Sequence, residues 1–216
     1  MKKAVIFDLD GLLIDSEIIS YKMYANLLQK YSLRFSLDTY TRSYSGKNGV
    51  TNMQNLIFTY HLPITLEQGL AYVDALEKDY FAKGVPLKPG ALELLGFLKY
   101  RKVKILLASS STRERALSVL AQHGIADDFD AMVFGPEIEC GKPAPDIFIK
   151  AREKSGEAGA DCLVLEDSEA GIRAAYAAGI DVICVPDMKR PDDAFLSAAA
   201  AVLPSLLDVP LWLETH

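Results

Sequence analysis

The chain has 216 residues, of which 50% are hydrophobic and 24% are charged, and its net charge is −6. A chain of this length and composition can bury its own core, and its negative charge argues against a general nucleic-acid-binding protein, which usually has a basic surface. A small anionic substrate stays compatible with this charge, because a local cation can outweigh a diffuse negative field.

The first predicted element is a buried strand over Ala4–Phe7, a short apolar run with β-branched residues. This run is too short for a signal peptide or a membrane span, which need roughly 7–15 and about 18 apolar residues. The cysteines Cys140, Cys162 and Cys184 lack C-x-x-C spacing, which favours reduced thiols. We therefore expect a cytoplasmic protein that binds no membrane.

A block of helices follows this strand. Apolar residues recur at helical spacing over Ser16–Tyr31, and further helices are predicted at 37–43, 49–60 and 66–82. No convincing strand is predicted in this block. The segments 83–86 and 88–90 are rich in glycine and proline and end it.

From about residue 87 onward, predicted strands and helices alternate. The strands are Val103–Ala108, Ala131–Phe134, Cys162–Leu165 and Asp181–Val185. The helices are Ala91–Arg101, Arg113–His123, Pro145–Lys154 and Glu169–Ala178. Strands that are apolar on both faces and separated by helices are typical of a parallel sheet covered by helices. The alanine run Ala198–Ala201 is interpreted as a helix end or a loop.

The helical block thus interrupts an α/β pattern after a single strand. The simplest architecture is a Rossmann-like, doubly wound parallel sheet with an inserted α-helical cap domain. We predict an α/β catalytic core made of residues 1–14 and 87–216, and a helical cap domain made of residues 15–86.

Polar residues stand where four of the predicted strands end or in the loop that follows. In chain order they are Asp8, Asp10, Ser109, Lys142, Glu166 and Asp167. Because ligands of open α/β sheets bind at the carboxyl ends of the strands, we expect these residues at one rim. Each of them alone is an ordinary turn or cap residue. Together, with these chemical types, they indicate a functional site.

These residue types suit the hydrolysis of a phosphate ester. A carboxylate such as Asp8 can attack phosphorus and form an aspartyl-phosphate. Mg²⁺ would remove the repulsion between the two anions, and Lys142 and Ser109 would stabilise the phosphoryl oxygens. Asp10 would point to the same side as Asp8 in an extended strand, where it could protonate the leaving oxygen and then deprotonate the attacking water.

The segments that hold these residues resemble the four motifs of the haloacid dehalogenase-like hydrolase superfamily, in order and over essentially the whole chain. They are Asp8–Asp15, Leu106–Ser109, Gly141–Asp146 and Leu165–Ser168. The resemblance implies that Asp8 is the nucleophile and Asp10 the acid/base, while Ser109, Ser110 and Lys142 bind phosphate. It also implies Mg²⁺ held by Asp8, the backbone carbonyl of Asp10 and Asp167, with Glu166 nearby or coordinating.

Within the superfamily, the chain resembles β-phosphoglucomutases, pseudouridine-5′-phosphatases and sugar-phosphate phosphatases. Dehalogenases and phosphonate-cleaving members lack the second aspartate, so the presence of Asp10 favours phosphoryl transfer. The mutases usually carry a histidine on the first cap helix, about where Ser20 stands. We therefore expect a phosphatase acting on a small phosphorylated metabolite, a sugar phosphate or a nucleoside monophosphate, with a phosphosugar mutase as the alternative.

The segment Ser45–Gly49 resembles the cap loop that faces the active site in these families. This resemblance implies that Gly46, Lys47 and Asn48 contact the substrate, and a surface turn is the alternative interpretation. Arg113 and Arg115 are interpreted as solvated helix residues, long enough to reach an anionic substrate. A non-catalytic binding protein is disfavoured, because every catalytic motif is intact. The expected assembly is a monomer or weak homo-oligomer, and the particular substrate stays open.

Overall fold

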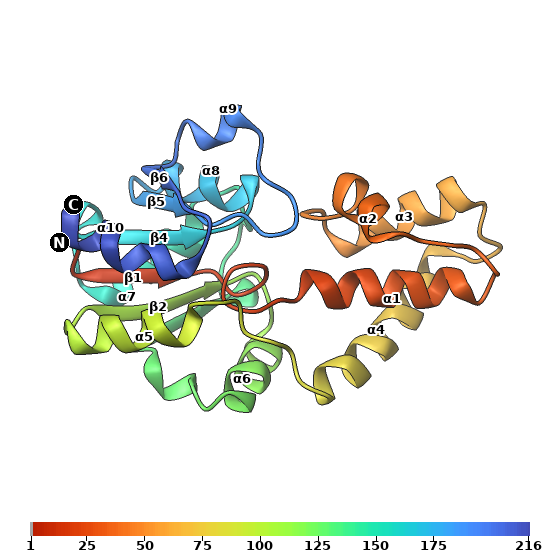
Figure 1. Ribbon diagram of the computed structural model, residues 1–216, viewed down its shortest axis with the longest axis horizontal. Helices are drawn as coiled ribbons and strands as arrows, with labels where there is room; N and C mark the ends of the chain where they lie inside the picture. Colours follow the sequence, from red (N-terminus) through yellow and green to blue (C-terminus); the bar gives the residue numbers. More distant parts are fainter. Residues whose placement is uncertain (1) are drawn as a thin grey trace. The chain divides into compact units, whose positions relative to one another are not determined.

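The computed structural model describes residues 2–216 and falls into two units (Figure 1). One unit contains the chain up to Asp15 together with Pro86–His216, and the other contains Ser16–Val85. The segments where the chain leaves the first unit and returns to it, near Asp15 and Pro86, lie side by side. The backbone nitrogen of Asp15 donates to the carbonyl of Pro86 at 2.8 Å, and Ile14 pairs with Leu87 in an antiparallel bridge.

A parallel sheet forms the centre of the first unit. Among residues 2–216 it has six strands in the order β3-β2-β1-β4-β5-β6. The strands are β1 (Ala4–Phe7), β2 (Lys104–Ser109), β3 (Ala131–Phe134), β4 (Cys162–Glu166), β5 (Asp181–Cys184) and β6 (Ala201–Val202). β1 is central, and its last residue Phe7 stands opposite Leu107 of β2 and Leu165 of β4. The carboxyl ends of β1, β2 and β4 therefore meet at one edge of the sheet.

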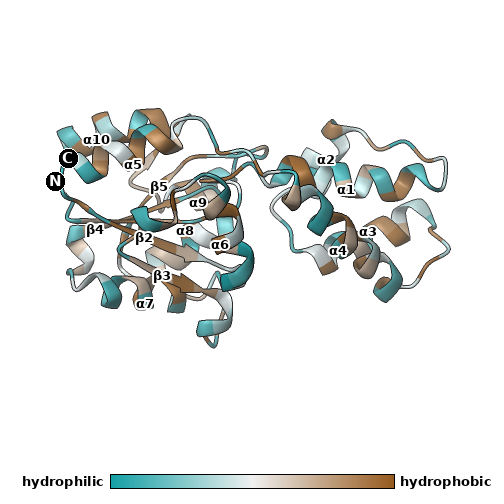
Figure 2. Cartoon of the chain, turned by 90° about the horizontal axis from the view of Figure 1, so that it is seen from below, coloured by the Kyte–Doolittle hydropathy of each residue, from teal (hydrophilic) through white to brown (hydrophobic). Residues whose placement is uncertain are grey.

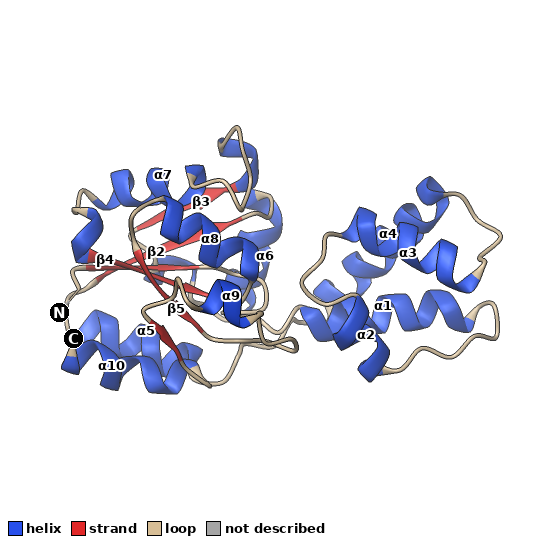
Figure 3. Cartoon of the chain, turned by 90° about the horizontal axis from the view of Figure 1, so that it is seen from above, coloured by secondary structure: helices blue, strands red, loops and turns tan. Residues whose placement is uncertain are grey.

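Helices cover both faces of this sheet. Figures 2 and 3 show α7 (Asp146–Ser155) on one face, and α5 (Ala91–Tyr100) with α10 (Val209–Thr215) on the other. The remaining helices of this unit are α6 (Arg113–Gln122), α8 (Glu169–Ala177), α9 (Asp193–Leu196) and the short 3-10 helices Ala126–Asp128, Gly135–Glu137, Gly159–Asp161 and Leu206–Asp208. The predicted α/β fold with a doubly wound parallel sheet is confirmed.

Burial on both faces explains why the strands are continuous apolar runs. Ala4 and Ile6 of β1 belong to one core cluster with Phe148 of α7. Phe7 points to the opposite face, where its ring meets the ring of Phe129 edge-on at 6.2 Å. Successive side chains of a strand alternate between faces, so both sets must be apolar when both faces are covered.

The second unit is helical. Its helices are α1 (Glu17–Gln29), α2 (Leu37–Ser43), α3 (Gly49–Tyr60) and α4 (Leu66–Ala82). The side chains of Ser36, Asn48 and Thr65 accept backbone N–H groups at the starts of α2, α3 and α4, so three of the four helices begin at a capping side chain. The ring of Phe35 packs near the rings of Tyr40, Tyr44 and Tyr60, and these aromatic contacts help to hold the unit together.

The alanine run near the C-terminus is mostly as expected. Residues 198–200 form the turn and bend after α9, whereas Ala201 lies in strand β6 and corrects the expectation at that position. The neighbouring nitrogens of Ala200 and Leu203 donate to the carbonyls of Val182 and Cys184 at 2.8 Å, so backbone pairing with β5 makes this strand. A side-chain pattern does not report such pairing, and the four-residue α9 is likewise too short for helical periodicity to predict.

Candidate active site

The residues expected at one rim come from the strand ends described above. The backbone nitrogen of Asp8 donates to the carbonyl of Leu165 at 3.1 Å, which continues the pairing of β1 with β4 by one residue. Ser109 is the last residue of β2, and Glu166 is the last residue of β4. Lys142 lies in the loop before α7. The sheet therefore brings a nucleophile candidate, a hydroxyl and a carboxylate to neighbouring positions.

Lys142 joins two of these strand ends. Its Nζ donates to Oδ1 of Asp8 and, at 2.5 Å, to Oε1 of Glu166. All three side chains are nearly excluded from water, with exposed fractions of 8%, 9% and 1% for Lys142, Asp8 and Glu166. Burial alone would lower the pKa of Lys142, but the two carboxylates raise it above its ordinary value. The ammonium group is therefore a fixed positive charge beside Asp8.

Glu166 is held tightly by its surroundings. Its Oε2 accepts the backbone nitrogens of Asp167 at 3.0 Å and Ser168 at 3.1 Å, and the Ser168 hydroxyl at 3.0 Å. The same hydroxyl caps α8 by accepting the nitrogen of Gly171. A Cβ on Gly171 would lie 1.8 Å from the carboxyl carbon of Glu166, so any larger residue would displace that side chain. Sequence reasoning missed this role of Gly171.

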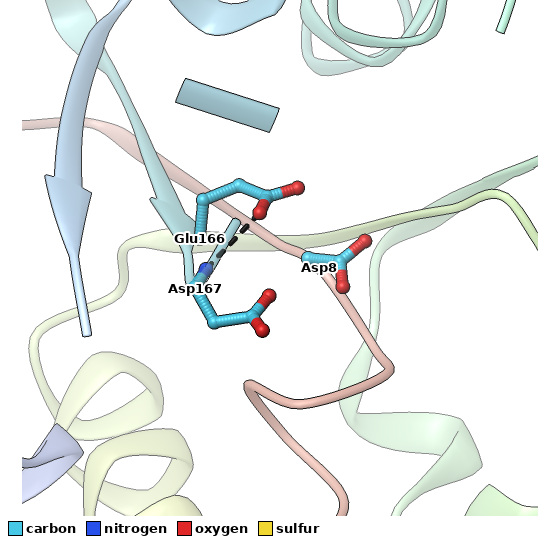
Figure 4. A group of neighbouring side chains, drawn as sticks. All are labelled: Asp8, Glu166 and Asp167. Atoms are coloured by element: carbon cyan, nitrogen blue, oxygen red, sulfur yellow. Dashed lines mark hydrogen bonds between the residues drawn. The ribbon is translucent and has the colours of Figure 1, made fainter. Parts of the chain in front are cut away.

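Three carboxylates gather next to Lys142. Oxygens of Asp8, Glu166 and Asp167 lie within 4.8 Å of one another (Figure 4). Burial raises the pKa of Asp8 to about 7, against the effect of Lys142. Burial, together with Glu166, Asp8 and Asp187, raises the pKa of Asp167 well above its ordinary value. The cluster thus holds more negative charge than its surroundings neutralise.

Asp187 adds a fourth carboxylate to this region. Its Oδ1 accepts Nζ of Lys88 at 2.5 Å, whereas its buried Oδ2 has no hydrogen-bond partner among residues 2–216. Burial raises its pKa. A hard divalent cation prefers such oxygen ligands and would offset the excess charge, so the residues present fit Mg²⁺.

Asp10 lies differently from the sequence-based expectation. β1 ends at Phe7, so Asp8 and Asp10 both lie beyond the strand and the alternation rule does not orient them. Arg115 donates to both oxygens of Asp10, from Nη2 to Oδ1 at 2.8 Å and from Nη1 to Oδ2 at 2.9 Å. Arg115 is only 24% exposed, so its interpretation as a solvated helix residue is wrong. Arg113 is 59% exposed and pairs with Glu137.

The two serines of the candidate phosphate site differ in exposure. Ser109 is 1% exposed, and its Oγ accepts the backbone nitrogen of Ser111 at 3.1 Å. Ser110 is exposed. A Cβ on Gly135 would lie 2.3 Å from the carbonyl oxygen of Ser110, so the loop backbone is closely packed there. The loop is therefore held in place at both of the serines expected to bind phosphate.

The expected cap residues lie in the helical unit. Gly46 adopts a positive φ of 74°, Lys47 Nζ donates to the carbonyl of Ser43 at 2.7 Å, and the Asn48 side chain caps α3. Lys47 lines a hollow of about 250 Å³ within this unit, which Ser20 and Asn52 also line. Asn48 thus has a structural role that the sequence comparison with related cap loops does not reveal.

Two further expectations concern the cysteines and membrane-spanning helices. Cys140 is exposed, Cys162 and Cys184 are buried, and all three are unpaired. Within residues 2–216, every helix falls short of the length and apolarity that crossing a membrane requires.

Comparison with known proteins identifies relatives over nearly the full chain. A family model described as haloacid dehalogenase-like hydrolase matches residues 2–179. A phosphorylated carbohydrates phosphatase from Thermotoga maritima is 31% identical over 202 residues, covering 93% of each chain. A β-phosphoglucomutase from Bacillus subtilis is 34% identical over 189 residues, covering 85% of this chain and 83% of that protein.

The fold comparison agrees. The crystal structure of a HAD family hydrolase from Deinococcus radiodurans R1, with bound phosphate and sodium, superimposes with a TM-score of 0.82. It is 28% identical, and the match covers 99% of this chain and 96% of that one. Sequence and fold therefore point to the same group of proteins.

Proposed function

The chain belongs to the haloacid dehalogenase-like hydrolases, and on that premise we propose that it is a Mg²⁺-dependent phosphatase with Asp8 as nucleophile. The observation that carries the proposal is the contact of Asp8 with Lys142 at the edge of a buried carboxylate cluster. In this proposal, residues 1–14 and 87–216 form the catalytic core, and residues 15–86 form the cap. The substrate is a small phosphorylated metabolite, of the sugar phosphate or nucleoside monophosphate type.

The first half of the reaction forms a phosphoryl–enzyme bond. An oxygen of Asp8 attacks phosphorus, and the bond to the leaving oxygen breaks as Asp10 gives that oxygen a proton. Lys142 neutralises charge on the phosphoryl group, and Ser109 and Ser110 donate hydrogen bonds to its oxygens. The product of this half-reaction is an aspartyl-phosphate at Asp8 and a free alcohol.

The second half returns the enzyme to its starting state. Asp10, now a carboxylate, takes a proton from water as that water attacks phosphorus, and the bond to Asp8 breaks. Asp8, the backbone carbonyl of Asp10 and Asp167 would hold Mg²⁺, with Glu166 beside them. The ion supplies positive charge that lets the anionic nucleophile approach the anionic ester.

The cap selects the leaving group in this proposal, through Gly46, Lys47 and Asn48. The hollow beside Lys47 is also lined by three acidic residues, Glu17, Asp74 and Glu77. Such surroundings disfavour a second phosphate group. This favours hydrolysis of a monophosphate over a mutase reaction, which passes through a bisphosphate.

A phosphosugar mutase is the second candidate, because a β-phosphoglucomutase is among the relatives. Ser20 stands about where those mutases usually carry a histidine, which supports the phosphatase instead. A cytoplasmic location and a monomer or weak homo-oligomer complete the proposal; the unpaired cysteines suit a reducing compartment.

The test is phosphate release from a panel of sugar phosphates and nucleoside monophosphates, with Mg²⁺ or with EDTA. We expect release from some members with Mg²⁺ and loss of at least about 10²-fold in EDTA. Asp8→Asn is the matched inactive control. Faster formation of glucose 6-phosphate than of free phosphate, from β-glucose 1-phosphate with a bisphosphate activator, would favour the mutase. Release that is equal in EDTA would contradict the role of Asp167.

A further inference from the structure

The carboxylate of Asp10 lies in a network that sequence reasoning did not predict. Besides the two bonds from Arg115, it accepts a hydrogen bond from the Ser111 hydroxyl, with Oγ 2.9 Å from Oδ2. Arg115 Nη1 also donates to that hydroxyl oxygen at 2.6 Å. Two parallel bonds between a guanidinium and a carboxylate fix the plane of both groups. The direction of the Asp10 carboxylate is therefore set by α6 and by the loop that precedes it.

The sequence around Arg115 places it for this contact. Thr112 caps α6 by accepting the backbone nitrogen of Arg115, so Arg115 stands in the first turn of the helix. A positive charge at a helix N-terminus opposes the helix dipole, and local helix stability therefore does not explain an arginine here. The preceding loop is anchored as well, because Gly135 donates its backbone nitrogen to the carbonyl of Ser111 at 3.2 Å. The contact with Asp10 therefore explains the arginine at this position, which helix stability does not.

We propose that Arg115 is a positioning residue for the reaction, which acts through Asp10 and is supported by Ser111. The inference rests on the proposed function, in which Asp10 protonates the leaving oxygen and later activates water. Both steps need one carboxylate oxygen at a defined place beside the phosphoryl group. A guanidinium in the plane of the carboxyl group holds that group against rotation, which a lysine cannot do with a single point charge. When Asp10 carries its proton on one oxygen for the first step, the other oxygen still accepts from Arg115.

This role makes a prediction about leaving groups. An ester whose leaving group is already a stable anion needs little help from Asp10, whereas a basic leaving group needs a proton in the transition state. The value of kcat/KM reports the steps up to the first phosphoryl transfer, so it isolates the protonation step. Loss of Arg115 should therefore harm esters with basic leaving groups more than esters with acidic ones.

The experiment compares p-nitrophenyl phosphate with phenyl phosphate, which have nearly the same shape but leaving groups of different basicity. We expect Arg115→Met to lower kcat/KM for phenyl phosphate by about 10-fold or more, and for p-nitrophenyl phosphate by no more than about threefold. Arg115→Lys should fall between wild type and Arg115→Met. Arg113→Met is the matched control, because Arg113 is on the same helix and pairs with Glu137 instead of Asp10.

A double-mutant cycle separates positioning from a general effect of charge. In an Asp10→Asn background, Arg115→Met should change kcat/KM for phenyl phosphate by less than about twofold, because its partner is already gone. Two results would overturn the inference while the phosphatase proposal stands. One is an equal decrease in kcat/KM for both esters in Arg115→Met, and the other is an undiminished decrease when Arg115→Met is added to Asp10→Asn. A wild-type enzyme that hydrolyses neither ester would count against the proposed function itself. If Arg115→Met does not fold, Ser111→Ala and Arg115→Lys carry the same comparison.

Discussion

Replacing Lys142 with methionine should lower the free energy of unfolding by about 3 kcal/mol or more in EDTA, and kcat by at least about 10²-fold. Methionine keeps the length and apolar stem of lysine but removes the ammonium group that lies between Asp8 and Glu166. Two buried carboxylates would then face each other with their shared cation gone. Urea unfolding followed by circular dichroism, together with phosphate release, measures both effects.

Lys150→Met is the matched control for this change. Lys150 is 37% exposed; its Nζ donates to the backbone carbonyl of Glu137 at 2.7 Å and lies 3.8 Å from Oε2 of the same residue. An exposed pair of this kind contributes about 0–1 kcal/mol, so the control should unfold near the wild-type urea concentration. If both variants unfolded at urea concentrations equally far below that of the wild type, the burial of Lys142 between two carboxylates would not explain its contribution to stability.

Replacing Asp167 with asparagine should raise the free energy of unfolding in EDTA, unlike Lys142→Met, but should lower kcat as Lys142→Met does. In EDTA near neutral pH we expect the variant to be more stable by about 1 kcal/mol. The amide is neutral in both states, whereas Asp167 must either take up a proton or carry a charge among like charges when the chain folds. For a chain of this size that increase in stability corresponds to a rise in melting temperature of about 2–4 °C. Mg²⁺ should stabilise the wild type but not the variant, because the variant lacks a ligand.

The pH dependence of this difference has a defined sign. The pKa of Asp167 is raised in the folded state, so the folded protein holds a proton that the unfolded chain releases above about pH 4. The cost to wild-type stability therefore grows as pH rises from about 4 toward neutrality, and it is absent below that range. Melting temperatures in EDTA from pH 4 to 8 measure it, with exposed Asp127→Asn as the control. The difference in melting temperature between Asp167→Asn and wild type should widen as pH rises over this range. A difference that narrows would contradict this account.

Most strands and helices were predictable because the apolar patterns that indicate them are local and recur along the chain. The strand Ala131–Phe134 and the helix Leu37–Ser43 have the bounds that their apolar patterns predict. The order of the strands across the sheet was not predictable from those patterns, since it depends on pairing between distant segments. β6 shows the same limit, because its two residues become a strand only through hydrogen bonds to β5.

The site residues were suggested by their chemical type and their place at strand ends. The partners that orient them lack such a signal. Arg115 is one charged residue on a helix among several, and its contact with Asp10 spans 105 positions of sequence. Gly171 resembles any other helical glycine until the carboxyl group of Glu166 is placed beside it. The roles assigned to the individual residues stay predictions, which the variants above address.

The central claim is that Asp8 carries the phosphoryl group during turnover, and the most direct measurement is the mass of the enzyme quenched in acid during hydrolysis of p-nitrophenyl phosphate with Mg²⁺. Asp10→Asn should accumulate the adduct, because it lacks the base that activates water. We predict one added phosphoryl group, located on the peptide that contains Asp8, and no adduct in Asp8→Asn. Phosphate release by Asp8→Asn at the wild-type rate, or a phosphoryl group on another residue, would contradict the mechanism.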